Sequence, residues 1–280
     1  MKQNFTVTLI SVILTTMIFL SCATTPDAGN RNGEFKMNEL KIEKDEKTIF
    51  GQIFMPSNSE TKHPLIIMSH GYNGCYTDFF ADAVFFAQNG YVCYCYDFCG
   101  GSNRSKSSGK TTEMTVYTEK QDLLDIFSYF EEQDYIDSEK IYLWGGSQGG
   151  FVSALAAAEL NSKVKGLILL YPALCIPDNW NETYKSESEI PESLNFWGMT
   201  LGREFFITAR NIDVYQTICS YTGPVYIFHG TNDQIVPVSY SEKAKKIYKK
   251  AILVTLPGEG HGFTPNAQSQ VRKYALKFIR

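Results

Sequence analysis

Short apolar runs recur along the chain, and the segments between them carry apolar residues at helical spacing. The runs are typical of strands buried on both faces of a sheet, and they occupy residues 64–71, 91–98, 140–145, 164–173, 225–230 and 251–258. The helical patterns occupy residues 79–90, 115–133, 148–160 and 241–250 and a last segment that ends at Ile279. Strands that alternate with helices predict a parallel sheet with right-handed crossovers.

Residues 39–43 and 48–55 precede this alternation and predict a leading antiparallel pair of strands. The expected fold class is therefore α/β, with a mostly parallel, twisted sheet of about eight strands and helices on both of its faces. Residues 176–210 are too long for a plain connection, and we expect them to form a small cap insertion. We assign residues 39–280 to one domain, because α/β folds often reach this size.

The first 22 residues have the plan of a secretion signal. A lysine is followed by an apolar stretch from Val7 to Leu20, which is short for a membrane span and ends just before Cys22. Cys22 resembles the lipid-modified cysteine of bacterial lipoproteins, although Phe19 stands where a leucine is usual. Cleavage after Ala23 is the alternative, because the residues before it fit a small-x-small pattern.

We therefore expect an exported protein that is anchored to the membrane through a lipid on Cys22, or is otherwise periplasmic or secreted. Residues 23–38 are rich in turn-forming and polar residues, and we expect them to be a polar tether.

Composition and charge narrow the function classes. The 280 residues carry a formal net charge of −4, which argues against a nucleic-acid partner because no basic stripe could neutralise phosphates. The lysines clustered in residues 241–250 are typical of a solvated helix face. The chain has seven cysteines, six of them after Cys22, and none of these six belongs to a Cys/His cluster with zinc spacing. We expect no metal, no disulfide and no cofactor.

Residues 144–150 read WGGSQGG and follow a predicted strand, at an end where ligands gather in open α/β sheets. A Walker loop would need Gly-Lys-Ser/Thr, and a dinucleotide fingerprint would need spaced glycines in an early βαβ unit; neither pattern is present. Gly145 to Gly149 instead fit Gly-x-Ser-x-Gly, in which small residues two before and two after the serine allow a strained turn. We therefore predict that Ser147 is a nucleophile.

A serine nucleophile needs a base, and the chain has four histidines. His70 and His229 each end a predicted strand and are expected to be structural, and His63 is expected to be exposed. His261 lies in a glycine-rich loop after the last predicted strand and before the last helix. That position selects His261 as the expected base.

The base needs a carboxylate that orients it. Asp233 follows the strand at residues 225–230, where the acid is expected, whereas Asp213 falls before that strand. Glu259 is close to the histidine in sequence and stays a competitor. The order Ser147, Asp233, His261 is the nucleophile–acid–base order expected for such a sheet.

An oxyanion hole needs two backbone N–H groups. One is expected from Gln148, the residue after the nucleophile, and the other from Tyr72 in the loop SHGYNG after the first buried parallel strand. Gly71 and Gly74 would let that backbone approach a substrate closely.

The motifs SHGYNG, GGSQGG, DQIVP and GEGHGF, in this order and at these separations, resemble the α/β-hydrolase superfamily. Residues 171–180 and the insertion that follows look most like the cinnamoyl and feruloyl esterase branch, which is related to the dienelactone hydrolases. Residues 96–105 depart from the more familiar Asp-x-x-Gly-x-Gly-x-Ser loop. The resemblance covers residues 40–280 and implies an acyl-enzyme hydrolase.

We therefore expect a serine hydrolase that cleaves the carboxylic ester of a small molecule or a glycan-linked group. The aromatic residues of the cap suit a flat acyl group, although packing alone would also account for them; Trp180 and Trp197 are the ones to test. A serine peptidase or an acyl thioesterase on the same fold, and a catalytically silent binding protein, remain as alternatives.

Overall fold

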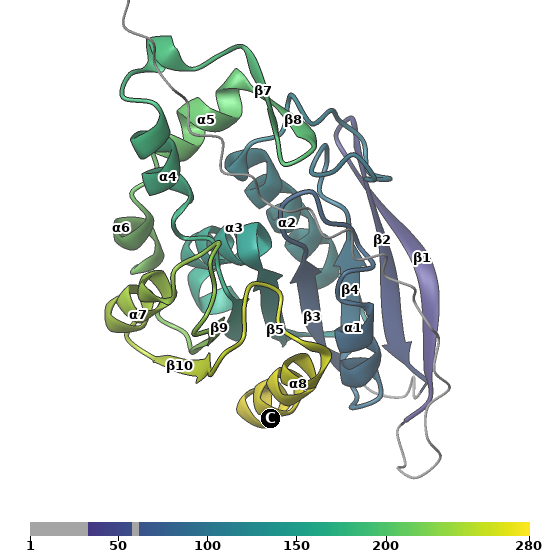
Figure 1. The fold of residues 1–280 in the computed structure, drawn as a ribbon. Coiled ribbons are helices and arrows are strands. Elements are labelled where there is room, and N and C mark those ends of the chain that lie inside the picture. Colours follow the sequence, from purple (N-terminus) through teal and green to yellow (C-terminus); the bar gives the residue numbers. More distant parts are fainter. Residues whose placement is uncertain (1–32, 58–61) are drawn as a thin grey trace, which may run out of the picture. The chain divides into compact units, whose positions relative to one another are not determined.

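An eight-stranded sheet runs through residues 33–57 and 62–280, the part of the chain that this computed structural model describes (Figure 1). Its strands are β1 (Phe35–Lys44), β2 (Lys47–Pro56), β3 (His63–Ser69), β4 (Val92–Tyr96), β5 (Ile136–Gly146), β6 (Gly166–Leu170), β9 (Val225–Gly230) and β10 (Ala251–Leu256). Their order is β1-β2-β4-β3-β5-β6-β9-β10. Only the β1–β2 and β2–β4 pairs are antiparallel. The prediction of a mostly parallel sheet with a leading antiparallel pair is confirmed.

Helices cover both faces of the sheet because the central strands are apolar on both sides. These helices are α1 (Phe80–Ala87), α2 (Val116–Glu131), α3 (Ser147–Leu160), α6 (Val214–Ile218), α7 (Val238–Ile247) and α8 (Pro265–Ile279), with the short η1 (Asn161–Lys163). Along β3, Ile66 and Met68 pack with α1 and α8, whereas Leu65 and Ile67 pack with α2 and α3. Figure 1 shows these two pairs of helices on opposite sides of the sheet.

Residues 176–210 lie above the carboxyl ends of the strands and contain two helices and a hairpin. Their elements are α4 (Ile176–Thr183), η2 (Glu187–Glu189), β7 (Ser193–Phe196), β8 (Met199–Gly202) and α5 (Arg203–Arg210). Trp180, Phe205 and Phe206 pack against one another and join the same core as α2 and α3. This segment is called the cap below.

One boundary and one burial state differ from the sequence analysis. Residues 35–38, expected in the polar tether, form the first part of β1, which pairs with β2 from Phe35 opposite Pro56 to Lys44 opposite Lys47. An edge strand is held by backbone hydrogen bonds, so a polar side-chain pattern does not mark where it begins. His63, expected to be exposed, is buried, with Nδ1 3.3 Å from the carbonyl oxygen of Gly90.

The predicted signal segment, Cys22 and residues 23–32 lie outside the described residues. No helix in residues 33–57 and 62–280 is long and apolar enough to cross a membrane. The six cysteines of this part of the chain carry free thiols, and five of them are buried.

Candidate active site

Ser147 lies at the sharp turn between β5 and α3, and its backbone is left-handed, with φ of +50°. This conformation is unfavourable for a residue with a side chain and directs the hydroxyl out of the sheet. The neighbours of the turn leave no room for side chains. A Cβ on Gly149 would collide with the carbonyl oxygens of Ser69 and His70, and one on Gly145 would collide with that of Gly149. The two glycines of the motif are therefore required by close backbone packing.

The structure brings Ser147, His261 and Asp233 together in one hydrogen-bonded chain. Nε2 of His261 is 2.9 Å from Oγ of Ser147, and Nδ1 of His261 is 2.8 Å from Oδ2 of Asp233. A carboxylate accepts, so Nδ1 carries the hydrogen and Nε2 is left to accept from the serine hydroxyl. The three residues are 86 and 28 positions apart in sequence, but each follows the carboxyl end of a parallel strand.

Asp233 is held in the ionised form by its surroundings. Burial alone would raise its pKa, but hydrogen bonds from His229, His261 and the backbone N–H groups of Val236 and Ile235 outweigh burial and hold the pKa well below its usual range. The two N–H groups donate to Oδ1 at 2.9 Å each. Oδ2 is left to face the two imidazoles, so the carboxylate has a single orientation.

His229 makes a contact that the sequence analysis did not foresee. Its Nε2 is 2.9 Å from the carbonyl oxygen of Val236 and 3.2 Å from Oδ2 of Asp233. Both neighbours are acceptors, so Nε2 carries a hydrogen. Nδ1 is 2.7 Å from the hydroxyl of Ser241 in α7. The sequence analysis classed His229 as structural because it ends a strand, but its position four residues before Asp233 is a signal for this contact.

The competing acids face elsewhere. Oδ1 of Asp213 accepts from the backbone N–H of Gln216 and caps α6. The carboxylate of Glu259 accepts from the backbone N–H and the hydroxyl of Thr264, just before α8. Neither carboxylate contacts His261, so the geometry favours Asp233 as its partner.

The loop at residues 70–74 lies beside Ser147. A Cβ on Gly71 would be 3.2 Å from Cβ of Ser147, and within the described residues the backbone N–H groups of Tyr72 and Gln148 donate to no acceptor. The ring of His70 braces this loop, since Nδ1 donates to the carbonyl oxygen of Gly71 (2.7 Å) and Nε2 accepts from the backbone N–H of Phe98 (3.2 Å). Burial lowers the pKa of His70, which keeps the ring neutral.

The unusual segment at residues 96–105 supports the same loop. Oδ1 of Asp97 accepts from the backbone N–H of Tyr76, and Oδ2 accepts from that of Lys106, both at 2.7 Å. Oδ1 of Asn73 accepts from the hydroxyl of Ser102 (3.2 Å). The departure from the familiar motif therefore leaves a segment that is hydrogen-bonded to the loop beside Ser147.

A buried carboxyl group lies behind Gln148. Oε2 of Glu119, on α2, is 2.7 Å from the side-chain Nε2 of Gln148, and Glu119 is 1% exposed. Burial raises the pKa of Glu119 to about 8, the nearby Asp122 adds to the rise, and the bond from Gln148 opposes it. Sequence reasoning missed this residue, although Glu119 lies three positions after Val116 and four before Leu123, on the buried face of the helix.

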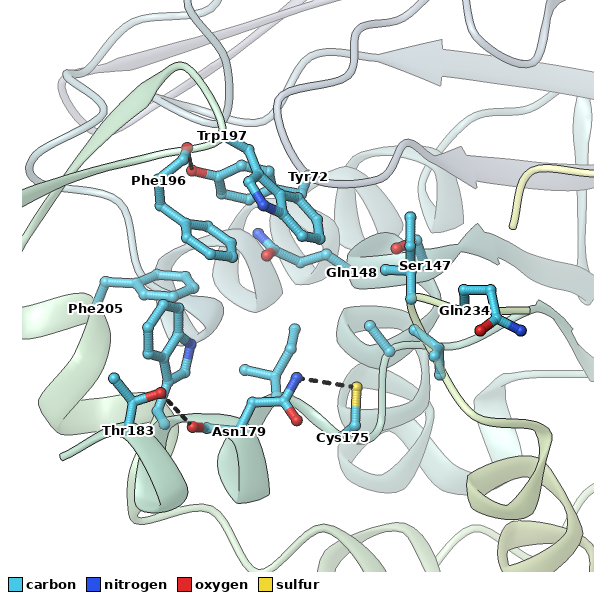
Figure 2. Close-up of a pocket in the computed structure, with 15 residues that line it drawn as sticks. Tyr72, Ser147, Gln148, Cys175, Asn179, Thr183, Phe196, Trp197, Phe205 and Gln234 are labelled. Carbon is cyan, nitrogen blue, oxygen red and sulfur yellow. Dashed lines mark hydrogen bonds between the residues drawn. The ribbon is translucent and has the colours of Figure 1, made fainter. Parts of the chain in front are cut away.

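Two cavities meet at Ser147. The first has a volume of about 290 Å³ and lies between the strand ends and the cap. Figure 2 shows Ser147 and Gln148 at one side of it, with Phe196, Trp197 and Phe205 across from them. The amide of Asn179 and the hydroxyl of Thr183 are its polar groups farther into the cap.

The second cavity, of about 240 Å³, lies on the side of His261 and is lined by Asp78, Gly146, Tyr171 and Trp197. Trp197 borders both cavities and is 63% exposed, so its ring stands at the mouth of the site. No group of three or more His, Cys, Asp or Glu side chains suited to a metal ion occurs in residues 33–57 and 62–280.

The model of the prolyl oligopeptidase family (Peptidase_S9) matches residues 77–280. The chain belongs to this family. Among solved structures, Est1E from Butyrivibrio proteoclasticus with ferulic acid bound is 30% identical, and the similarity covers 85% of this chain and 98% of Est1E with a TM-score of 0.77. The predicted α/β-hydrolase fold is thereby confirmed.

Two further proteins are similar in sequence to this member of the prolyl oligopeptidase family. The bifunctional esterase/perhydrolase DCH of Acinetobacter calcoaceticus is 23% identical over 261 residues, which are 78% of this chain and 92% of DCH. An uncharacterised 31.7 kDa protein of the traX-finO intergenic region of Escherichia coli is 29% identical over 122 residues. That match spans 41% of this chain and only 39% of the relative. The protein thus has the α/β-hydrolase fold and esterase relatives.

Proposed function

We propose that the protein hydrolyses carboxylic esters through an acyl-enzyme on Ser147. The observation that carries this proposal is the continuous hydrogen-bonded chain from Oγ of Ser147 through the ring of His261 to Oδ2 of Asp233. A serine hydroxyl becomes a nucleophile only when a base is positioned to take its proton, and this chain supplies the base and the group that orients it.

The reaction follows from these contacts. Oγ of Ser147 attacks the ester carbonyl carbon while Nε2 of His261 takes the hydroxyl proton, and Asp233 stabilises the resulting imidazolium. The backbone N–H groups of Tyr72 and Gln148 donate to the oxyanion. Collapse of this intermediate breaks the bond to the alcohol oxygen, which takes the proton from Nε2. A water molecule, deprotonated by His261, then attacks the acyl group and releases the acid.

The lining of the first cavity favours an ester with an aromatic acyl group as the substrate. Its walls include Trp180, Phe196 and Phe205, and the ring of Trp180 packs edge to face with each of the other two. Aromatic walls of this kind favour flat, apolar groups. The similarity to Est1E with ferulic acid bound points the same way.

Hydrolysis of methyl ferulate and of p-nitrophenyl acetate tests the proposal. We expect the wild type to hydrolyse both, with the larger kcat/KM for the ferulate, and the Ser147→Ala and Asp233→Ala variants to lose about 10⁴-fold or more in kcat. Asp213→Ala and Glu259→Ala are the matched acid controls and should retain activity. Turnover by Ser147→Ala would refute the mechanism. If the wild type hydrolyses neither ester but is still labelled by a fluorophosphonate, peptide or thioester substrates are favoured. If it is not labelled either, a binding protein is favoured.

We also propose that the protein is exported and anchored to a membrane by a lipid on Cys22, as the pattern of its first 22 residues indicates. Metabolic labelling with a radioactive fatty acid should mark the wild type and not Cys22→Ala. An unlabelled wild type would favour plain cleavage after Ala23 and a periplasmic or secreted protein.

A further inference from the structure

The two cavities at Ser147 can each hold one half of an ester, the acyl group or the alcohol. The leaving oxygen must receive a proton from Nε2 of His261, so the alcohol half of the substrate has to lie on the side of that ring. His261 lines the second cavity and does not line the first. The acyl half therefore belongs in the aromatic first cavity, and the alcohol half belongs in the second.

Tyr171 is the unusual residue of this second cavity. The residue is 9% exposed and lines the cavity, and its hydroxyl makes no hydrogen bond with any residue in the described part of the chain. A Cβ on Gly146 would lie 3.4 Å from this hydroxyl, so the group is beside the residue that precedes the nucleophile. A hydroxyl that lines a cavity and has no partner in the protein is free to bond to water or to a ligand.

The backbone of Tyr171 is held in an unfavourable conformation. Its φ is +37°, a left-handed conformation that is unfavourable for an aromatic residue. Two hydrogen bonds secure the turn: the N–H of Tyr171 donates to the carbonyl oxygen of Phe228 (2.7 Å), and that of Ala173 donates to the carbonyl oxygen of Ser147 (2.9 Å). The ring is packed against His261 and Phe263, with centroids 4.6 and 4.8 Å apart.

Packing explains the ring of Tyr171 but not its hydroxyl, since a phenylalanine would fill the same space. Asp78 adds an acceptor to the same cavity and is exposed at its rim. Its Oδ2 accepts from the backbone N–H of Cys75 (3.1 Å) and its Oδ1 accepts from the thiol of Cys75 (3.6 Å). A carboxylate has about four acceptor positions, so capacity is left over. The cavity thus offers one donor without a partner and one acceptor with spare capacity.

We propose that the second cavity binds the alcohol half of the ester and selects a polyhydroxylated alcohol, with the Tyr171 hydroxyl donating to an alcohol oxygen and Asp78 accepting from a neighbouring hydroxyl. This inference rests on the proposed function and adds the substrate's alcohol to it. Glycerol and a monosaccharide share the required pattern of adjacent hydroxyl groups. Tyr171 is then a specificity-determining residue that touches the substrate.

The test compares esters of one aromatic acid that differ only in the alcohol. The butyl and 2-methoxyethyl esters have the same length, and the second replaces one methylene by an ether oxygen that can only accept. After correction for their rates of alkaline hydrolysis, wild type should prefer the 2-methoxyethyl ester by about 3- to 10-fold in kcat/KM, the range of one neutral hydrogen bond. Tyr171→Phe should hydrolyse the two esters equally well.

The ratio of the kcat/KM values of one protein for two substrates does not change when part of the enzyme is unfolded. Tyr248→Phe is the control, because the Tyr248 hydroxyl likewise has no partner within the described residues but is buried in the core and lines neither cavity. This variant should keep the wild-type ratio. The glyceryl and 6-O-glucosyl esters then identify the source of the alcohol, as the one with the larger kcat/KM.

Equal kcat/KM values for the butyl and 2-methoxyethyl esters in wild type would overturn the inference, and so would a preference that survives in Tyr171→Phe. Both outcomes leave the serine mechanism intact. The proposed function fails separately, if wild type hydrolyses none of the esters or if Ser147→Ala still does.

Discussion

Glu119→Gln should make the stability of the protein less dependent on pH. The carboxyl group lies in the core between α2 and α3, where Oε2 is 2.7 Å from Nε2 of Gln148. Burial raises its pKa from an ordinary value of 4.5 to about 8. A glutamine has the same shape, retains an oxygen that accepts from Gln148 and carries no proton to lose. The substitution therefore removes the titration and keeps the hydrogen bond.

The magnitude follows from proton linkage. Because the pKa of Glu119 is higher in the folded state, the folded protein keeps a proton that the unfolded chain releases above pH 4.5. The stabilisation is fully present below pH 4.5 and is lost as pH rises through about 8, with a slope that approaches 1.36 kcal/mol per pH unit (about one proton). Between pH 6 and pH 8 the wild type should therefore lose about 2 kcal/mol through this group.

Urea denaturation followed by tryptophan fluorescence at pH 6, 7 and 8 measures this loss, and urea carries no charge that would screen the site. The change in unfolding free energy from pH 6 to pH 8 should be smaller in Glu119→Gln by about 2 kcal/mol. Glu113→Gln is the control: Glu113 is exposed and paired with Lys110, which lowers its pKa, so it is ionised throughout this range. An unchanged pH slope in Glu119→Gln would refute the reasoning that burial keeps this carboxyl protonated.

Two further substitutions test the turn at Ser147 and the first cavity. Gly149→Ala places a Cβ against the carbonyl oxygens of Ser69 and His70, so we expect a loss of about 1–3 kcal/mol in urea denaturation and a fall in kcat; wild-type values would show that the turn has room to spare. Phe205→Ala removes a buried wall of the first cavity and should raise KM for methyl ferulate while leaving kcat/KM for p-nitrophenyl acetate nearly unchanged. Equal losses on both esters would mean that the acyl group lies elsewhere.

The sheet was predictable from sequence because its central strands are buried on both faces. Residues 65–68 and 167–171, for example, are apolar at every position, as expected of strands that are covered on both faces. The first strand was predicted too short for the opposite reason. Met37 is 48% exposed, and the residues around it contribute mainly backbone hydrogen bonds, which carry no side-chain pattern.

Ser147, Asp233 and His261 could be picked out because each has a local signature: two glycines around the serine, a strand end before the acid and a glycine-rich loop around the histidine. The partners behind them could not be picked out in the same way. Glu119 and Gln148 are 29 residues apart and meet only when α2 packs against α3. A cavity wall such as Tyr171 is likewise a property of several segments at once, and a tyrosine at the end of a strand looks like core.

Strained turns at the ends of β5 and β6 place the proposed nucleophile beside the cavity proposed for the alcohol. Side chains in a regular strand alternate between the two faces of the sheet, so a residue at the strand end can point toward a ligand only if the chain turns sharply. Ser147, with φ of +50°, and Tyr171, with φ of +37°, both make that turn in the left-handed region. The hydrogen bond from the N–H of Ala173 to the carbonyl oxygen of Ser147 joins the two turns. Each such conformation costs on the order of 1–3 kcal/mol, and the surrounding buried strands hold both in place. The proposed nucleophile and the hydroxyl proposed to contact the alcohol are therefore positioned by two joined turns, whereas the cavity proposed for the acyl group depends on the cap.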